Sequence, residues 1–171
     1  MKTIVLGGEC FWCIEAVYQR VKGVEKVVSG YAGGDKDDPT YHDHADHAEV
    51  IQVTYDPKVI PLDTILDMFF YTHDPTTKDR QGNDVGTQYR SIALVSEDEV
   101  EAVKAAMKRA ESLWDDPLLT EIKVLDKFYE AEDYHQDYYN QNKEADYCQV
   151  IINPKIAKFE KKFADYLKAL G

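Results

Sequence analysis

Hydrophobic and polar residues alternate along the chain in stretches that fit short strands and amphipathic helices. The apolar residues 4–6 end at two glycines, which is typical of a buried strand followed by a sharp turn. A helix is expected over residues 10–22, because Cys13, Val17 and Val21 recur at helical spacing and a glycine follows. The first residue of this helix is a cysteine.

The rest of the pattern predicts further elements separated by polar turns. Pro61 suits the start of a helix, and Ser96 with Glu99 forms a capping box at the start of another. A polar, aromatic segment at residues 128–147 has no assigned element. The expected strands are 24–31, 49–55, 91–95 and 122–125, and the expected helices are 61–73, 96–114 and Pro154 to Leu170.

The order of these elements predicts the fold class. Up to residue 95 it is strand, helix, strand, strand, helix, strand, which is typical of the split βαβ or ferredoxin-like arrangement. We therefore expect an α+β fold, a two-layer ferredoxin-like sandwich with a C-terminal helical extension. A length of 171 residues suits one core, so residues 1–171 are expected to form a single catalytic domain.

Composition limits the partners. The chain has 20 Lys and Arg against 32 Asp and Glu, and its net charge of −12 repels phosphate backbones and anionic lipid surfaces. It also has no apolar run of about 20 residues and no signal-peptide core at its start. We expect a soluble, cytoplasmic protein with no nucleic-acid or membrane partner.

The three cysteines indicate thiol chemistry. Cys10 is expected to lie exposed at a helix N-terminus, where backbone N–H groups and the helix dipole stabilise a thiolate, and the apolar Phe11 and Trp12 follow it. A small buried cysteine is the less favoured alternative. Cys13 completes a C-x-x-C motif, so a thioredoxin-like dithiol enzyme is a rival hypothesis, although an inert cysteine in the apolar stripe is equally compatible.

Two further features bear on chemistry. Alternate residues of a strand point to the same face, so Glu49 is expected to point to the apolar side with Ile51, Val53 and Tyr55. Burial there would raise the pKa of Glu49 and let it act as an acid. A solvated position at the start of the strand is the alternative. Residues 41–49 hold three histidines. Their spacing from the cysteines does not fit a zinc site, so we expect a solvated loop and no metal, with zinc binding as the rival hypothesis.

Several motifs resemble one known family. They are Gly-Gly-Glu-Cys-Phe-Trp-Cys at 7–13, Gly-Tyr-Ala-Gly-Gly at 30–34, Pro-Thr-Tyr at 39–41, His-Ala-Glu-Val at 47–50, His-Asp-Pro-Thr-Thr at 73–77, Arg-Gln-Gly-Asn-Asp at 80–84, Gly-Thr-Gln-Tyr-Arg-Ser at 86–91 and Ala-Glu-Asp-Tyr-His-Gln at 131–136. Together they span nearly the whole chain, which resembles the methionine sulfoxide reductases of the A class.

The resemblance implies a mechanism. Cys10 would attack the sulfoxide sulfur and Glu49 would protonate the oxygen. The substrate-binding residues would be Tyr41, Asp84 and Tyr89 at the oxygen, with Phe11 and Trp12 around the methyl group. The family also implies specificity for the S epimer of methionine sulfoxide, free or in proteins, in repair of oxidative damage. A sulfenic acid on Cys10 would pass to a disulfide, which thioredoxin, or dithiothreitol in vitro, reduces; no bound cofactor is expected.

The chain departs from the family at two positions. Glu9 and Cys13 both stand where glycine is usual, and a carboxylate facing Cys10 would oppose thiolate formation. The resolving cysteine is either Cys13 or Cys148. Cys148 is favoured, because it follows a polar run in which a loop can move, and because many family members place this cysteine toward the C-terminus.

Overall fold

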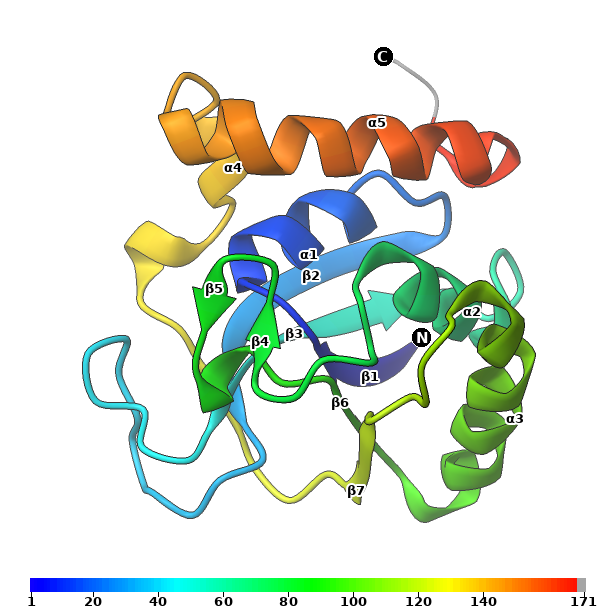
Figure 1. The fold of residues 1–171 in the computed structure, drawn as a ribbon, viewed down its shortest axis with the longest axis horizontal. Helices are drawn as coiled ribbons and strands as arrows, with labels where there is room; N and C mark the ends of the chain where they lie inside the picture. Colours follow the sequence, from blue (N-terminus) through cyan, green and yellow to red (C-terminus); the bar gives the residue numbers. More distant parts are fainter. Residues whose placement is uncertain (169–171) are drawn as a thin grey trace.

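A six-stranded sheet forms the centre of the computed structural model, which describes residues 1–168 (Figure 1). The strands are β1 (Lys2–Gly7), β2 (Val24–Ala32), β3 (Ala48–Tyr55), β6 (Ile92–Val95), β7 (Glu121–Val124) and β8 (Phe128–Glu130). They lie in the order β7-β6-β1-β3-β2-β8, and the pairs are antiparallel except β6 with β7. A short hairpin of β4 (Arg80–Gln81) and β5 (Asp84–Val85) stands apart from this sheet.

The described part of the chain has five α-helices around the sheet. They are α1 (Phe11–Tyr18), α2 (Leu62–Thr72), α3 (Val100–Ala110), α4 (Tyr138–Gln141) and α5 (Asn153–Lys162). α1 packs on β2 and β3, α2 packs on α3, and α5 lies over α1 on the side away from the sheet (Figure 1). Within residues 1–168, no helix is both long and apolar enough to span a membrane.

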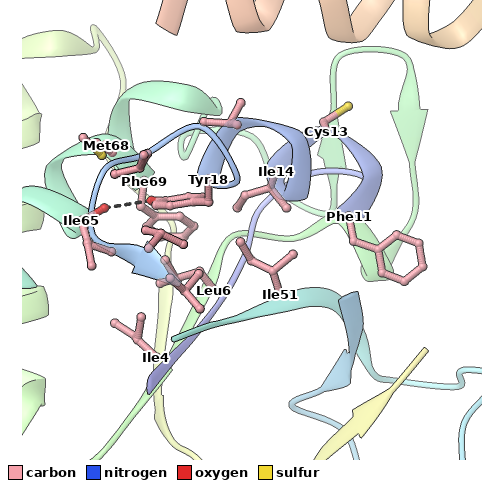
Figure 2. Packing of buried hydrophobic residues seen from close by; sticks show 14 of the residues in the cluster. Ile4, Leu6, Phe11, Cys13, Ile14, Tyr18, Ile51, Ile65, Met68 and Phe69 are labelled. Atoms are coloured by element: carbon pink, nitrogen blue, oxygen red, sulfur yellow. Dashed lines mark hydrogen bonds between the residues drawn. The ribbon is translucent and has the colours of Figure 1, made fainter. Parts of the chain in front are cut away.

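Alternation along the central strands produces two buried clusters. Ile4 and Leu6 of β1 face the larger cluster, together with residues of α1 and α2 (Figure 2). Val5 belongs to a smaller cluster on the opposite side of the sheet. Tyr18 is fully buried in the larger cluster, and its hydroxyl donates a 2.8 Å hydrogen bond to the Ile65 carbonyl. This bond satisfies the one polar atom of a large core side chain.

The predicted elements up to residue 95 are all present, in a mixed sheet with helices around it. The first helix is shorter than the expected 10–22, because α1 ends at Tyr18. The chain then turns to pair with the C-terminal segment, where the Lys22 N–H donates to the Tyr166 carbonyl at 2.7 Å. The sequence did not predict β4, β5 or β8.

The C-terminal helix also differs from the expected span of 154–170. A π-helical segment, Cys148–Ile152, runs directly into α5, and a short 3-10 turn at Ala164–Tyr166 follows α5. Helical structure therefore begins six residues earlier than expected. Leu170 lies outside the described residues.

Candidate active site

The loop between β1 and α1 carries Cys10 and packs against the ring of a buried histidine, His73. A Cβ on Gly8 would lie 2.5 Å from Cδ2 of His73, so glycine allows the loop to rest directly on this ring. His73 is itself buried, with Nδ1–H donating to the Phe69 carbonyl at 2.6 Å and Nε2 accepting from the Ser91 hydroxyl at 2.8 Å. Burial lowers the pKa of His73 to about 4, so the ring stays neutral and fixed.

Cys10 lies at the N-terminus of α1 as predicted, but it is buried and not exposed. The residue is only 6% accessible to solvent. Burial raises the pKa of the Cys10 thiol well above its usual value, aided by a hydrogen bond with Cys13, and the backbone N–H of Trp12 only partly opposes this. Cys10 is therefore a protonated thiol at neutral pH, whereas the sequence predicted a stabilised thiolate.

Glu49 lies on the predicted apolar side of β3. It is buried, and its Oε1 accepts a 3.1 Å hydrogen bond from the Phe11 N–H at the start of α1. Burial raises the pKa of Glu49 to about 8, and the charge of Asp84 acts in the same direction. The carboxyl is therefore mostly protonated at neutral pH, and the alternative of a solvated Glu49 is wrong.

Aromatic side chains form a wall beside the thiol. The Trp12 ring stacks on Tyr138 with centroids 3.8 Å apart, and its indole N–H donates to Nδ1 of His135 at 3.1 Å. Tyr41 lies over His135, with ring centroids 4.5 Å apart. Phe11 is fully buried behind this wall, so in this structure its direct contribution to the site is the N–H that binds Glu49.

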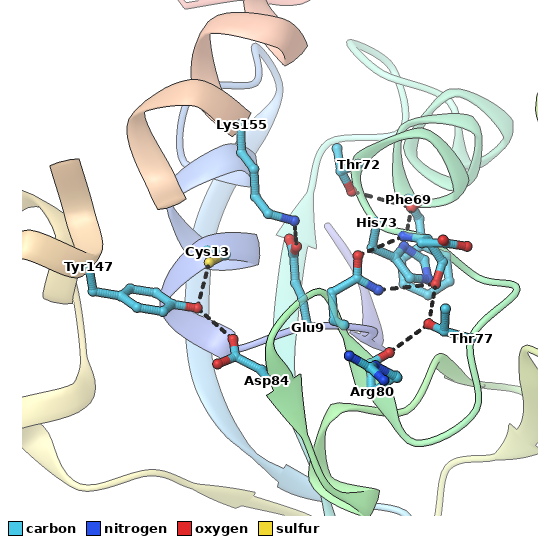
Figure 3. Close-up of polar contacts among 12 residues, drawn as sticks. Glu9, Cys13, Phe69, Thr72, His73, Thr77, Arg80, Asp84, Tyr147 and Lys155 are labelled. Carbon is cyan, nitrogen blue, oxygen red and sulfur yellow. Dashed lines mark hydrogen bonds and ion pairs between the residues drawn. The ribbon is translucent and has the colours of Figure 1, made fainter. Parts of the chain in front are cut away.

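The other predicted binding residues face the same space. The charges of Glu49 and Cys10 both raise the pKa values of Tyr41, to about 12, and of Tyr89, after the larger effect of burial. Both phenols are therefore hydrogen-bond donors at neutral pH. The Asp84 carboxylate accepts a 2.8 Å hydrogen bond from the hydroxyl of Tyr147, a residue of the C-terminal segment (Figure 3).

The remaining two cysteines lie on facing helices. Cys13 is buried on α1, and its Sγ is 3.5 Å from the Tyr147 hydroxyl oxygen (Figure 3). Cys148 is fully buried at the start of the π-helical segment, which packs against α1. Cys148 is less free than expected, because its side chain lies on the apolar face of a helical segment, although a turn at residues 142–145 precedes it. All three cysteines are free thiols.

Glu9 does not face the Cys10 sulfur. Its carboxylate is buried and forms an ion pair with Lys155 of α5 (Figure 3). Burial raises the pKa of Glu9, and the ammonium of Lys155 opposes that rise. The second oxygen, Oε1, has no hydrogen-bond partner within residues 1–168. The pair therefore connects the residue before the nucleophile to the C-terminal helix.

The histidine-rich loop is less solvated than expected. His47 is buried, with Nδ1 accepting from the Gly34 N–H at 3.1 Å and Nε2–H donating to the Lys36 carbonyl at 2.6 Å, so both ring nitrogens bind backbone. In the part of the chain that the structure describes, no group of three or more His, Cys, Asp or Glu side chains is arranged to hold a metal ion.

Sequence reasoning gave no role to three residues that shape the site: His73, His135 and Tyr147. The first two stand in the quoted motifs 73–77 and 131–136, so the motifs were a usable signal. Tyr147 lies in none of these motifs. Only its neighbour Cys148 pointed to this segment.

Comparison with known proteins gives consistent matches. The family model described as "Peptide methionine sulfoxide reductase" matches residues 2–167. A peptide methionine sulfoxide reductase MsrA of Paenarthrobacter aurescens is 52% identical, over 99% of this chain and 100% of the relative. The crystal structure of reduced Mxr1 from Saccharomyces cerevisiae is 37% identical, with a TM-score of 0.78, over 86% of this chain and 88% of that one. The same protein in complex with Trx2 is 29% identical, with a TM-score of 0.57, over 80% and 84%.

Proposed function

Because the chain belongs to the peptide methionine sulfoxide reductase family, we propose that Cys10 and Glu49 are the groups that carry out its reaction, the reduction of methionine sulfoxide to methionine. One observation carries this assignment: a buried thiol at a helix start shares one site with a buried carboxyl that holds its proton near neutral pH. A sulfoxide requires such a pair, a nucleophile for its sulfur and an acid for its oxygen.

The site suits a neutral, dipolar substrate with a methyl group. The phenols of Tyr41 and Tyr89 and the protonated Glu49 are donors for the sulfoxide oxygen, and the Trp12 ring offers an apolar surface to the methyl group. Asp84 would orient the donors once substrate displaces the Tyr147 hydroxyl from it. Phe11 supports this wall from behind and holds Glu49 through its N–H.

The protonation states suggest how charge is balanced. Glu49 gives its proton to the sulfoxide oxygen, and the resulting carboxylate takes the proton of the Cys10 thiol, so no net charge is created in the buried site. The thiolate then attacks sulfur. An S–S bond forms, the S–O bond breaks, and the hydroxide that leaves attacks the Cys10 sulfur, which breaks the S–S bond. Cys10 then holds a sulfenic acid and methionine leaves; the substrate gains the two electrons that Cys10 loses.

The catalytic cycle ends on a disulfide. A second thiol of the chain condenses with the Cys10 sulfenic acid, releasing water, and thioredoxin reduces the disulfide that results; the relative Mxr1 has been crystallised with Trx2. We assign the resolving role to Cys148, with Cys13 as the alternative first partner. No bound cofactor is required by these steps, and dithiothreitol can replace thioredoxin in vitro.

The proposal also covers the fold class, the domain organisation and the substrate specificity of the chain. The order β6-β1-β3-β2, with antiparallel neighbours, supports a two-layer ferredoxin-like core with a C-terminal helical extension. We treat residues 1–171 as one catalytic domain, specific for the S epimer, free or in proteins, that repairs oxidative damage in the cytoplasm. Nucleic acid and membranes are not expected partners.

The test is an epimer-resolved assay. A peptide with methionine S-sulfoxide and the same peptide with the R-sulfoxide are incubated separately with enzyme and dithiothreitol, and methionine is quantified. We expect reduction of the S epimer alone, and its loss in Cys10→Ser. Equal reduction of both epimers, or undiminished reduction by Cys10→Ser, would refute the assignment. Efficient reduction of insulin disulfides would instead favour a thioredoxin-like enzyme.

A further inference from the structure

A cavity of about 470 Å³ borders the proposed active site and has no part in the mechanism above. Its lining includes Glu9, Asp84, Tyr147 and Lys155 (Figure 3). Among the described residues, the aromatic side chains assigned to the sulfoxide group do not line it. Ligand pockets in proteins usually measure about 300–1,000 Å³, so this cavity has room for one further side chain of a substrate.

The lining of the cavity carries more negative than positive charge. Its charged side chains, within residues 1–168, are the carboxylates of Glu9 and Asp84 and the single ammonium of Lys155. Burial raises the pKa of Glu9, Lys155 opposes that rise, and the charge of Asp84 adds to it, so the two carboxylates lie close enough to interact. One additional positive charge would balance the three groups.

Glu9 also has an acceptor atom that is not used. Its Oε2 binds Lys155, whereas its Oε1 is buried and has no hydrogen-bond partner within residues 1–168. Buried polar atoms nearly always have a partner, so an unpartnered carboxylate oxygen beside a cavity indicates a place for a donor. Asp84 provides further acceptor capacity, because the Tyr147 hydroxyl binds only one of its two oxygens.

The π-helical segment adds an apolar surface to the same cavity. Val150 and Ile151 both line it, and Val150 is 68% exposed, so this apolar surface is open to solvent. Lysine and arginine side chains bury their aliphatic stems along apolar surface and carry the charged group at the far end. An exposed apolar surface next to two carboxylates matches both parts of such a side chain.

We propose that this cavity binds the side chain of a lysine or arginine that lies within two positions of the methionine sulfoxide in a peptide substrate. Its stem would pack on Val150, and its cationic group would bind Asp84 and Oε1 of Glu9. Glu9 directly precedes Cys10, and residues two apart in an extended peptide are separated by only about 7 Å, so such a side chain is within reach. The inference rests on the proposed function, because it takes the sulfoxide to be bound at Cys10.

Matched peptides test this subsite on the wild-type enzyme. Each peptide has one methionine S-sulfoxide and, at one of the four positions within two residues of it, either lysine or norleucine, which keeps the stem but lacks the ammonium. At one position or more, KM should be lower for lysine by about threefold or more, with kcat changed by less than about twofold, because the contact is the same before and during the reaction. Raising the salt concentration should weaken the preference.

Two results of this assay would count against different claims. Equal KM values for lysine and norleucine at all four positions would overturn the subsite and leave the proposed function intact. Failure to reduce any of the peptides would instead contradict the proposed function.

Charge changes at the exposed Val150 locate the preference without disturbing buried contacts. Val150→Glu should increase the ratio of the norleucine KM to the lysine KM, and Val150→Lys should bring it to one or below. The matched controls are Val59→Glu and Val59→Lys, at an exposed residue that does not line the cavity, and they should leave the ratio as in wild type. Equal shifts from the two positions would mean that only the net charge of the enzyme matters, which would overturn the subsite.

Glu9→Gln tests the acceptor itself. The ratio of the two KM values should fall toward one, and because both values come from the same variant, a change in its overall rate cancels. A ratio that stays at the wild-type value in a variant whose thermal melt shows a folded protein would exclude Glu9 from the subsite and overturn the proposal. If the melt shows an unfolded protein, the Val150 variants decide.

Discussion

Replacing Glu49 by glutamine should make the protein more stable at alkaline pH, although it removes the proposed acid. Glutamine keeps the size of the side chain and its amide oxygen can still accept from the Phe11 N–H, so the buried contact survives. The difference is that glutamine has no proton to lose. The change therefore isolates the cost of ionising Glu49 inside the protein.

The sign and size follow from the pKa of Glu49, about 8 in the folded chain against an ordinary value of 4.5. Below pH 4.5 both the folded and the unfolded chain hold the proton, so wild type and variant should differ little. Between 4.5 and 8 the unfolded chain loses the proton while the folded chain keeps it, and wild type loses stability relative to the variant. Each factor of ten in proton affinity is worth about 1.4 kcal/mol, so the full effect is on the order of 5 kcal/mol.

Urea unfolding of both proteins from pH 5 to pH 9 measures this effect. The free energy of unfolding of Glu49→Gln minus that of wild type should rise by about 4 kcal/mol over that range and level off above pH 8. The exposed Glu111→Gln is the matched control and should give a flat line. If Glu49→Gln is instead less stable than wild type at pH 8, the native carboxylate is ionised and paired, and its assignment as the acid fails.

Two other substitutions test the surroundings of the thiol. Trp12→Ala should lower kcat/KM for the S-sulfoxide by tenfold or more, while the free energy of unfolding falls by less than about 3 kcal/mol. The reason is that the ring is half-buried and forms the wall of the site, not the core. Normal turnover in a strongly destabilised protein would instead assign Trp12 a structural role. Lys155→Met leaves the Glu9 carboxylate buried without its cation and should cost about 3–5 kcal/mol at pH 8. The loss should become smaller as the pH falls, because burial raises the pKa of Glu9 and a bound proton removes its charge, and adding Glu9→Gln should restore most of the stability. Equal stability of Lys155→Met and wild type at pH 8 would contradict the ion pair.

Local periodicity was sufficient to predict the parts of the site that depend on one element. Glu49 could be placed on the apolar face because alternation along a strand is fixed by backbone geometry, and β3 keeps it from Ala48 to Tyr55. The position of Cys10 at a helix start followed in the same way from the stripe of α1 and the glycines before it. The presence of the central strands β1, β2, β3 and β6 followed likewise from their short apolar runs.

Contacts between segments that are far apart in the chain could not be predicted from the sequence. Cys10 was expected to be exposed, since nothing local indicates that the Tyr147 segment closes over α1. Glu9 and Lys155 are 146 positions apart, and their pairing depends on how α5 lies over α1. For Cys148 a local signal existed: buried residues 148, 152, 156 and 159 follow helical spacing, so the apolar stripe of the last helix begins at that cysteine.

The most direct test of the account is to locate the oxidised sulfur. A variant with Cys13→Ser and Cys148→Ser retains only Cys10, so a sulfenic acid formed there has no partner thiol. Mixed with S-sulfoxide and dimedone, it should release one methionine per chain and carry one dimedone adduct on the peptide that contains Cys10, and the R epimer should give neither. Methionine release with no adduct on Cys10, or release that persists when Cys10 is also changed to serine, would contradict the claim that Cys10 receives the sulfoxide oxygen.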